Sequence, residues 1–369
     1  MLGYSVFLPS YSVGENCYKE IPYVTRKFGT RAVVIGGKTA MSKAKPELEA
    51  AIKDSDVEIL DYIWYGGDSS YENVEMLKNN PLVTGADMLF GVGGGRACDT
   101  VKTLADMTGK KPFFTFPTLA SNCAACTAIT VMYNPDGSFK EYYYMHGPSY
   151  HTFINTKIIA DSPEKLLWAG IGDALSKECE VLYAGRDKFM YHTPLMGQCI
   201  AKICTTPLIE YGAKALEACR SNKPDFALEQ VALDIIISTG IVSNFATHEN
   251  QPDPADNYYY NSSLAHCVYY GASTLPQCER HLHGEIVAFG VLCLLTYDGQ
   301  LEERDRIMKF NKSVGLPVTL DELEITHDDL TKIADKAASV VEWTYVPGTP
   351  SKEKFIQAMI DTDKAGKNM

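Results

Sequence analysis

The residues with the clearest chemical potential form a glycine-rich stretch at positions 91–99, with the sequence GVGGGRACD. This stretch follows a run of β-forming residues at 87–92 and leads into helical composition at 97–107. Successive glycines allow a backbone to approach a ligand closely, and the N–H groups at a helix start suit a pyrophosphate. The spacing differs from the usual G-x-G-x-x-G dinucleotide pattern. The stretch is therefore interpreted as a phosphate-binding turn or, alternatively, as a tight strand-to-helix turn.

Cys123 and Cys126 form a C-x-x-C pair, which is a second candidate for chemistry. A redox pair needs a thioredoxin-like context, and a structural zinc site needs a second pair of ligands. The sequence offers neither, so we interpret the pair as two buried cysteines, with redox or structural metal chemistry as the alternative. The chain has eleven cysteines, odd in number and scattered, which predicts reduced thiols in a cytoplasmic protein.

Strands and helices alternate in the first half of the chain, and they must position the glycine-rich stretch. Such alternation predicts a parallel sheet covered by helices, that is, an α/β Rossmann-like domain. A β-hairpin is expected next, because the turn residues NPDG at 134–137 separate two β-rich runs. Strands are expected at 31–35, 57–63, 87–92, 112–116 and 153–159, helices at 39–53, 71–79 and 97–107, and hairpin strands at 127–133 and 139–144.

From residue 162 onward the composition is helical, with broad apolar faces at helical spacing. We therefore expect an α/β domain at 1–161 and an all-helical domain at 162–369, with the boundary near Asp161. The segment 247–261 is too polar and too rich in proline for a helix interior, and it is predicted to be a loop. Helical stretches are expected at 162–180, 195–217, 225–243 and 284–297.

Composition narrows the classes of function. The chain of 369 residues has a net charge of −12, which argues against nucleic-acid binding because phosphate backbones require a basic face. The longest apolar run, near 286–296, is too short to cross a bilayer, so no membrane association is expected. The N-terminus lacks a basic region followed by a long apolar run, so no secretory signal is expected. These features predict a cytoplasmic globular protein.

Several motifs together resemble one known family. Residues 93–102, GGGRACDTVK, resemble the GGGKxxDxxK signature of the iron-containing alcohol dehydrogenase superfamily, most of all its glycerol dehydrogenase branch. The resemblance continues, in order and at similar spacing, through nearly the whole chain. The further matching motifs are FPTLAS at 116–121, VMYNPDG at 131–137, GIGDAL at 170–175 and HGEIVAFG at 283–290.

The resemblance implies a dehydroquinate synthase-like architecture with a nicotinamide cofactor on the first domain. Arg96 departs from the usual Lys, which preserves charge but not shape. Gly37 stands where many members have an acidic residue that would bond the ribose and repel a 2′-phosphate. NAD is therefore expected, with NADP left open. The cofactor-binding residues implied are Gly37, Gly93, Gly94, Gly95, Arg96, Ala97, Thr118, Leu119, Ser121, Thr127, Ile129 and Tyr133.

The resemblance also implies catalytic metal ligands at Asp173, His266 and His283 on the second domain. One carboxylate and two imidazoles, with an open position, suit Zn²⁺. Without the resemblance, the aspartate could be a helix cap and the two histidines a core residue and a surface residue. The iron-dependent branch has a His four residues after the Asp, whereas Lys177 stands there in this chain, which favours Zn²⁺ over Fe²⁺. Lys177 is expected to pair with Asp173 or to point to solvent.

The activity implied by the resemblance is metal-dependent hydride transfer between a small alcohol or polyol and the nicotinamide, in a cleft between the domains. Cys123 stands where glycerol dehydrogenases usually have an Asp that contacts substrate hydroxyls. A thiol is a poor acceptor for a polyol, so Cys123 predicts a shift of specificity away from glycerol. The Tyr-rich loop 247–261 could add to this shift, or be a surface loop or an oligomer contact. The family's habit also predicts a homo-oligomer.

Three alternatives to this activity stay open from the sequence. Two are enzymes of related architecture, one like dehydroquinate synthase and one like glycerol-1-phosphate dehydrogenase. Both act on phosphorylated substrates and need clustered Lys and Arg side chains, for which the helical half shows no motif. The third alternative is a non-catalytic nucleotide-binding relative, for which the substitution at Cys123 is the sole support.

Overall fold

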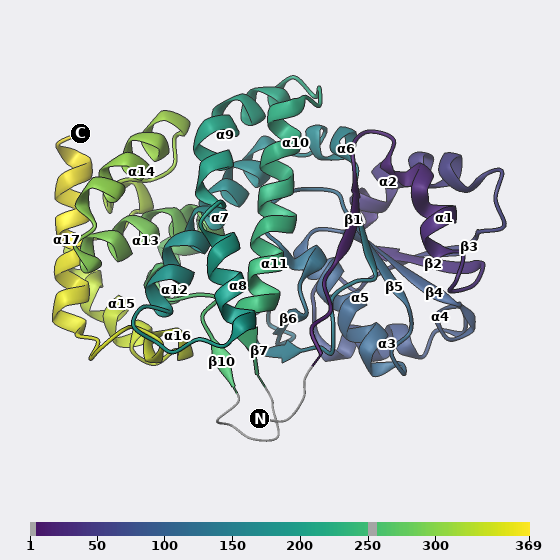
Figure 1. Ribbon diagram of the computed structural model, residues 1–369, viewed down its shortest axis with the longest axis horizontal. Helices are drawn as coiled ribbons and strands as arrows, with labels where there is room; N and C mark the ends of the chain where they lie inside the picture. Colours follow the sequence, from purple (N-terminus) through teal and green to yellow (C-terminus); the bar gives the residue numbers. More distant parts are fainter. Residues whose placement is uncertain (1–4, 250–256) are drawn as a thin grey trace. The chain divides into compact units, whose positions relative to one another are not determined.

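Figure 1 shows the computed structural model, in which residues 5–249 and 257–369 are described. The chain folds into two compact units, each with its own set of internal contacts. We call them the sheet unit and the helical unit. The sheet unit comprises Met1–Leu166 and Glu217–Asn244, and the helical unit comprises Leu167–Leu216 and Phe245–Met369.

The sheet unit is built around a six-stranded sheet in which every pairing is parallel (Figure 1). This confirms the predicted α/β fold with strands close to the expected positions. The strand order is β1-β8-β5-β4-β2-β3. The strands are β1 (Ser10–Val13), β2 (Arg31–Gly36), β3 (Glu58–Trp64), β4 (Met88–Gly93), β5 (Phe113–Pro117) and β8 (His151–Ile154).

Two features of the sheet differ from the sequence prediction. The strand expected at 153–159 is wrong, because β8 ends at Ile154 and helix α6 (Thr156–Ala160) begins at once. Asn155 causes the change, since its side chain accepts the first N–H groups of α6 and so caps the helix. Strand β1 was not expected, and it is held to β8 partly by Ser10 and Ser12 hydroxyls on the two ring nitrogens of His151.

The central strands β2, β4 and β5 are mostly apolar because both faces of the sheet are buried there. Successive side chains point to opposite faces, so neighbours in one strand join different cores. Val34 and Phe114 pack in the core that includes side chains of α1 (Ile21–Thr25) and α2 (Lys38–Ile52). Val33 and Phe113 pack in the core on the other face, with α3 (Tyr71–Lys78) and α5 (Gly95–Met107).

The chain reverses its direction of travel across the sheet at β2. This strand pairs with β3 on one side and with β4 on the other. Ligands of open α/β sheets bind outside the carboxyl ends of the strands at such a point. The remaining elements of the sheet unit are η1 (Cys17–Glu20), α4 (Pro81–Gly85), η2 (Ala124–Cys126) and the antiparallel hairpin of β6 (Ile129–Tyr133) and β7 (Phe139–Tyr144).

The chain is continuously helical from 226 to 246, where a helical stretch was expected at 225–243. This run contains a π-helical segment. It consists of α10 (Phe226–Leu233), η3 (Asp234–Ser238) and α11 (Thr239–Ala246). By length and composition this run could cross a membrane, but 67% of its apolar window is buried inside the protein, as in a core helix. Because Glu217–Asn244 groups with the sheet, the compact units differ from the domains expected at 1–161 and 162–369, which stay a prediction.

The remainder of the chain is rich in helix, as expected (Figure 1). Three of its helices, α7, α12 and α13, carry the metal candidates. Helices α12 and α13 pack closely against each other, and the backbone of α13 approaches that of α7 at Gly284. The helices are α7 (Glu164–Ala184), α8 (His192–Ala201), α9 (Thr205–Arg220), α12 (Leu264–Ala272), η5 (Pro276–Arg280), α13 (His283–Asp298), α14 (Leu301–Val314), η6 (Asp321–Leu323), η7 (His327–Asp329), α15 (Leu330–Ala337), α16 (Val341–Thr344) and α17 (Lys352–Lys367).

Two expectations for this half need correction. The stretch 195–217 is two helices and not one, because α8 ends at Ala201 and the carboxylate of Glu178 accepts the Thr205 N–H where α9 begins. The predicted loop 247–261 contains a short antiparallel pair, β9 (Thr247–His248) with β10 (Tyr258–Tyr259). The part of that loop at 250–256 lies outside the described residues.

Candidate metal and nucleotide sites

The metal candidates come together because two helix backbones touch. A Cβ atom on Gly284 of α13 would lie 1.8 Å from the Ala169 carbonyl oxygen of α7. A Cβ atom on Gly172 would lie 2.3 Å from the Gly284 carbonyl oxygen. Only glycine permits this approach. Asp173 follows Gly172 and His283 precedes Gly284. The contact between the two helices therefore places the side chains of Asp173 and His283 next to each other.

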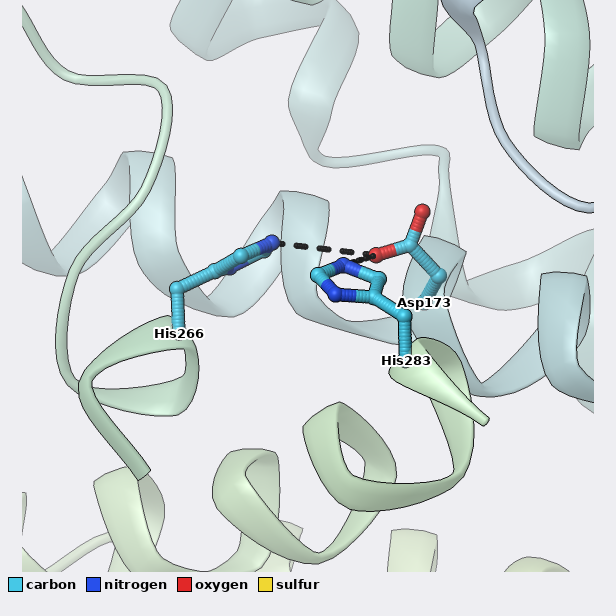
Figure 2. Close-up of side chains that lie close together, drawn as sticks. All are labelled: Asp173, His266 and His283. Atoms are coloured by element: carbon cyan, nitrogen blue, oxygen red, sulfur yellow. Dashed lines mark hydrogen bonds and ion pairs between the residues drawn. The ribbon is translucent and has the colours of Figure 1, made fainter. Parts of the chain in front are cut away.

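Asp173, His266 and His283 converge on one point (Figure 2). Asp173 Oδ1 lies 3.1 Å from His283 Nε2 and 3.7 Å from His266 Nε2, and one ligand atom of each residue lies within 4.8 Å of the others. Over residues 5–249 and 257–369, no other group of acidic, His and Cys side chains is as compact. One carboxylate oxygen and two imidazole nitrogens form a donor set that fits a zinc ion with an open position.

A buried carboxylate orients His266. Glu180 is 0% exposed, and its Oε2 lies 2.7 Å from His266 Nδ1. Its Oε1 accepts the backbone N–H groups of Ser263 and His266 at 2.7 and 3.0 Å. Because Nδ1 donates to Glu180, His266 Nε2 faces Asp173 with its lone pair available to a metal.

The charges of the cluster shift its pKa values together. Burial alone would raise the pKa of Asp173, but the charge and hydrogen bond of His283, with the charges of His266 and Lys177, lower it overall. Burial alone would lower the pKa of His266, yet Glu180 and Asp173 raise it overall. Burial would raise the pKa of Glu180, and its contacts with His266 lower it. The site thus keeps two carboxylates ionised beside its imidazoles, an environment that attracts a cation.

Lys177 does not behave as the sequence suggested. It is 7% exposed, and its Nζ donates to Asn261 Oδ1 at 2.6 Å and to the Asn261 carbonyl oxygen at 3.3 Å. Within the described ranges 5–249 and 257–369 it forms no ion pair. The prediction that it pairs with Asp173 or points to solvent is therefore wrong, because the segment leading into α12 covers this part of α7.

Two further side chains near the metal candidates have structural partners. Tyr269 packs edge-on against His283, with ring centroids 4.2 Å apart. His281 lies 2.8 Å from Glu285, whose carboxylate also accepts the Leu282 N–H at the start of α13. Tyr269 and Glu285 therefore help to set the position of His283 at the first turn of that helix.

The glycine-rich stretch forms the turn between β4 and α5. Gly93 has a φ of +149°, a conformation that L side chains rarely adopt, and Gly94 precedes the first turn of α5. A Cβ atom on Gly95 would lie 2.9 Å from the Asn122 side chain. Because Gly94 and Gly95 have no side chains, these residues leave the backbone N–H groups at the start of this 13-residue helix open. Such a helix start suits a pyrophosphate.

The other expected cofactor residues surround this turn within the sheet unit. Gly37 precedes α2 at the carboxyl end of β2, and its nitrogen lies 3.9 Å from where a Cβ of Gly93 would be. The Thr118 N–H donates to the Gly93 carbonyl at 3.2 Å. A Cβ on Gly94 would lie 3.4 Å from Leu119. The loops after β2, β4 and β5 therefore meet at the point where the strand order reverses.

Arg96 and Tyr133 complete one side of this region. The Arg96 guanidinium lies 4.8 Å from the centre of the Tyr133 ring and 3.2 Å from Asp68 Oδ2. Its side chain is 53% exposed, so the charge can reach a phosphate without losing contact with the ring. Ala97 is buried against Gly93, which fixes the first turn of α5, and Ser121 accepts a bond from Asn122.

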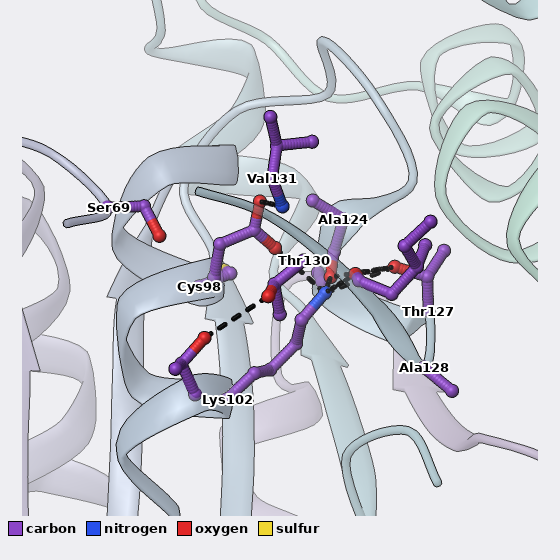
Figure 3. Close-up of polar contacts among 12 residues, drawn as sticks. Ser69, Cys98, Lys102, Ala124, Thr127, Ala128, Thr130 and Val131 are labelled. Carbon is purple, nitrogen blue, oxygen red and sulfur yellow. Dashed lines mark hydrogen bonds and ion pairs between the residues drawn. The ribbon is translucent and has the colours of Figure 1, made fainter. Parts of the chain in front are cut away.

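Lys102 is the anchor of the segment that contains Thr127 and Ile129 (Figure 3). Its fully buried ammonium donates to the carbonyl oxygens of Ala124 and Ile129, both at 2.7 Å, and to Thr127 Oγ1 at 3.1 Å. Asp99 pairs with Lys102 at 2.8 Å and accepts the Val131 N–H. Burial raises the pKa of Asp99, an effect that the Lys102 charge opposes. The pair ties helix α5 to the segment 124–131.

The C-x-x-C pair is reduced, as are all eleven cysteines. Cys126 is buried, and its thiol lies 2.6 Å from the Ile236 carbonyl oxygen. A Cβ on Gly240 would lie 2.1 Å from Cys126 Sγ, so glycine is needed there for η2 to pack on α11. Burial raises the pKa of Cys126 well above its ordinary value, which makes the thiol unreactive. Cys123 is partly exposed just before η2.

Sequence reasoning missed Glu180, Lys102, Asp99 and Asn261 as parts of these sites. Helical spacing offered a signal for the first, because residues seven apart on a helix share one face, and Glu180 follows Asp173 by two turns of α7. The motif that contains Asp99 and Lys102 was recognised, but its two charged residues were not assigned a role. Nothing in the sequence marked Asn261.

Comparison with known proteins identifies relatives along the whole chain. Residues 9–151 match the family model of iron-containing alcohol dehydrogenases. A glycerol dehydrogenase of Escherichia coli is 28% identical and aligns over 96% of this chain and 95% of its own length. Hydroxycarboxylate dehydrogenase A of Escherichia coli is 30% identical, over 82% and 80% of the two chains. A probable glycerol dehydrogenase from Sinorhizobium meliloti 1021 has a similar structure, with a TM-score of 0.82, 25% identity and complete coverage of both chains.

Proposed function

The chain belongs to the iron-containing alcohol dehydrogenase family, in its glycerol dehydrogenase branch, and we propose how its residues serve that chemistry. It is a metal-dependent oxidoreductase that transfers a hydride between a small alcohol or polyol and a nicotinamide cofactor. The lyase and non-catalytic alternatives have no better support among the relatives. The observation that carries the proposal is the convergence of Asp173, His266 and His283, with Glu180 orienting one imidazole.

Asp173, His266 and His283 would hold the catalytic metal. The donor set of one oxygen and two nitrogens favours zinc, and Lys177 offers no fourth protein ligand because an ammonium cannot ligate. When bound, the metal supplies Lewis-acid chemistry that lowers the pKa of a substrate hydroxyl. Glu180 keeps His266 Nδ1 protonated, so that Nε2 stays directed toward Asp173.

The cofactor would lie over the turn between β4 and α5. The N–H groups at the start of α5 and the Arg96 guanidinium would bind its phosphates, with Thr118, Leu119 and Ser121 beside them. Lys102 positions Thr127 and Ile129, which would line the other side with Tyr133. We propose NAD as the cofactor, although Gly37 leaves no acidic side chain to reject a 2′-phosphate.

Cys123 remains our candidate for a substrate contact, in the position where the branch usually has an acid. Because a thiol accepts hydrogen bonds poorly, glycerol is expected to be a weaker substrate than less polar alcohols. We further propose that the enzyme works as a homo-oligomer in the cytoplasm, where its free cysteines stay reduced.

The test is nicotinamide absorbance with zinc-loaded protein, comparing NAD and NADP with glycerol, propane-1,2-diol and hydroxyacetone. His266→Ala should lose bound zinc, measured by atomic emission, together with activity. His192→Ala, an exposed histidine on α8, is the matched control and should keep both. Zinc content and turnover that survive in His266→Ala would refute the assignment of the metal site.

A further inference from the structure

The segment 123–128 carries Cys123 and Thr127, two of the candidate site residues, and its regular structure is limited to the three residues of η2. Backbone carbonyls outside helices and ladders need hydrogen-bond donors from other parts of the chain. Three side chains, from α5, β5 and α11, supply such donors to three consecutive carbonyls of this segment. The pairs are Lys102 with Ala124, Thr115 with Ala125 and Asn244 with Cys126, at 2.7, 2.7 and 3.0 Å. Side chains from outside the segment therefore hold it in place.

The Asn244 amide binds the backbone on both sides of Thr127. Its Nδ2 donates to the Cys126 carbonyl oxygen at 3.0 Å, and its Oδ1 accepts the Ala128 N–H at 2.8 Å. This orientation of the amide pairs a donor with an acceptor at each end. Thr127 itself is 2% exposed, and its hydroxyl is held by Lys102. Because both neighbouring peptide groups are bound, the Thr127 side chain has little freedom to change direction.

The helical run 226–246 meets this segment at three positions spaced four residues apart. The Ile236 carbonyl oxygen accepts the Cys126 thiol, Gly240 leaves room for Cys126 Sγ, and Asn244 follows one turn later. Residues four apart lie on one face of a helix. Ile236 belongs to the π-helical segment η3, and such segments are rare and frequently found at functional sites. This face of the helical run therefore supports the segment that carries Cys123 and Thr127.

We propose that Asn244 is a positioning residue of the dehydrogenase, which holds the segment 123–128 in place for the nicotinamide half of the cofactor. The inference rests on the proposed function, in which Thr127 lines the cofactor and Cys123 contacts the substrate. Hydride transfer occurs at the nicotinamide, so a segment with a substrate contact belongs to that half. The phosphates would bind at the turn 93–97, whereas the contacts of Asn244 are at 126 and 128. Loss of Asn244 should therefore weaken binding of the nicotinamide half and leave the phosphate site intact.

The first test compares the affinities of the zinc-loaded protein for NAD and for ADP, which lacks the nicotinamide, by calorimetry. Asn244→Ala should lower the affinity for NAD by about 10-fold, the effect of one net hydrogen bond, and leave that for ADP unchanged. General damage to the fold would lower both affinities. Asn311→Ala is the matched control, because it removes a buried amide of α14 that donates to the Ala288 carbonyl oxygen. It should change neither affinity.

Alkylation by iodoacetamide, followed by mass spectrometry, reports on the segment without any ligand. Cys126 is 0% exposed and reacts when the segment opens, whereas the exposed Cys199 of α8 serves as the internal reference. Asn244→Ala should raise the rate at Cys126 relative to Cys199 by about 10-fold, and Asn311→Ala should leave it unchanged. Asn244→Asp serves if Asn244→Ala does not fold, because it keeps an acceptor for the Ala128 N–H and loses the donor to Cys126.

Three outcomes in Asn244→Ala would overturn the inference: equal losses of affinity for NAD and ADP, unchanged affinity for NAD, or unchanged alkylation of Cys126. If the native protein binds neither nucleotide, the proposed function fails and alkylation alone decides whether Asn244 holds the segment. Faster alkylation of Cys126 would then uphold this positioning, and an unchanged rate would refute it.

Discussion

Glu180→Gln is the perturbation that examines the metal site most directly. Glu180 accepts three hydrogen bonds while 0% exposed, and one of them, at 2.7 Å, orients His266 through Nδ1. The amide of Gln can still accept from the two backbone N–H groups, but it removes the negative charge that supports His266. Changes to such partners of a ligating histidine typically cost about 10- to 100-fold in metal affinity. This corresponds to about 1.4 to 2.7 kcal/mol of binding free energy.

The assay is competition for zinc between the protein and a chelator of known affinity at constant pH. Glu178→Gln is the matched control, because it makes the same chemical change on the same helix. Its carboxylate accepts the Thr205 N–H and contacts no metal candidate. Zinc affinity in Glu180→Gln equal to that of the native protein, or a loss of the same size in Glu178→Gln, would refute the reasoning that Glu180 supports His266.

Two further predictions concern the sheet unit. Lys102→Met should destabilise the protein by about 3 to 5 kcal/mol, because Asp99 is left buried without its partner; urea unfolding measures this, and a change near zero would contradict it. Nucleotide affinity should also fall, since Thr127 and Ile129 lose their anchor. Burial lowers the pKa of His151 from 6.5 to about 4. As pH falls, the imidazole is therefore protonated in the unfolded chain before it is protonated in the folded protein. The free energy of unfolding should fall as pH drops from about 6.5 to about 4. The loss is at most about 3 kcal/mol, and it should be absent in His151→Gln, measured by urea unfolding at each pH.

Local patterns in the sequence determined most of the sheet and its glycine-rich turn. Apolar runs of five or six residues, such as those that became β2 and β4, indicate strands buried on both faces without any knowledge of their neighbours. Glycines after such a run predict a turn whose backbone is open to a ligand. The prediction of a strand at 153–159 was wrong because the Asn155 side chain caps a helix. The local sequence is equally compatible with a helix that begins there and with a strand that continues.

The resemblance to a known family pointed to Asp173, His266 and His283 as ligands. The spacing of these residues along the chain could not show that they lie together in the fold. Their meeting depends on the contact of Gly172 with Gly284, which are more than one hundred residues apart and carry no signal of their own. Taken alone, Asp173 was also consistent with a helix cap, His266 with a core position and His283 with a surface position. Only packing distinguishes these outcomes, because the burial of a side chain is a property of what surrounds it.

The sequence by itself therefore determined most of the elements, the α/β class and the family of this protein. The tertiary structure alone decided which charges are paired. Lys177 was expected to meet Asp173 or solvent, yet Asn261, from a segment distant in the chain, covers and binds it. Glu180 became the partner of His266 for the same reason. Local propensities arise from neighbours within a few residues, whereas the partner of a buried charge is chosen by long-range packing and by the cost of leaving that charge without a partner.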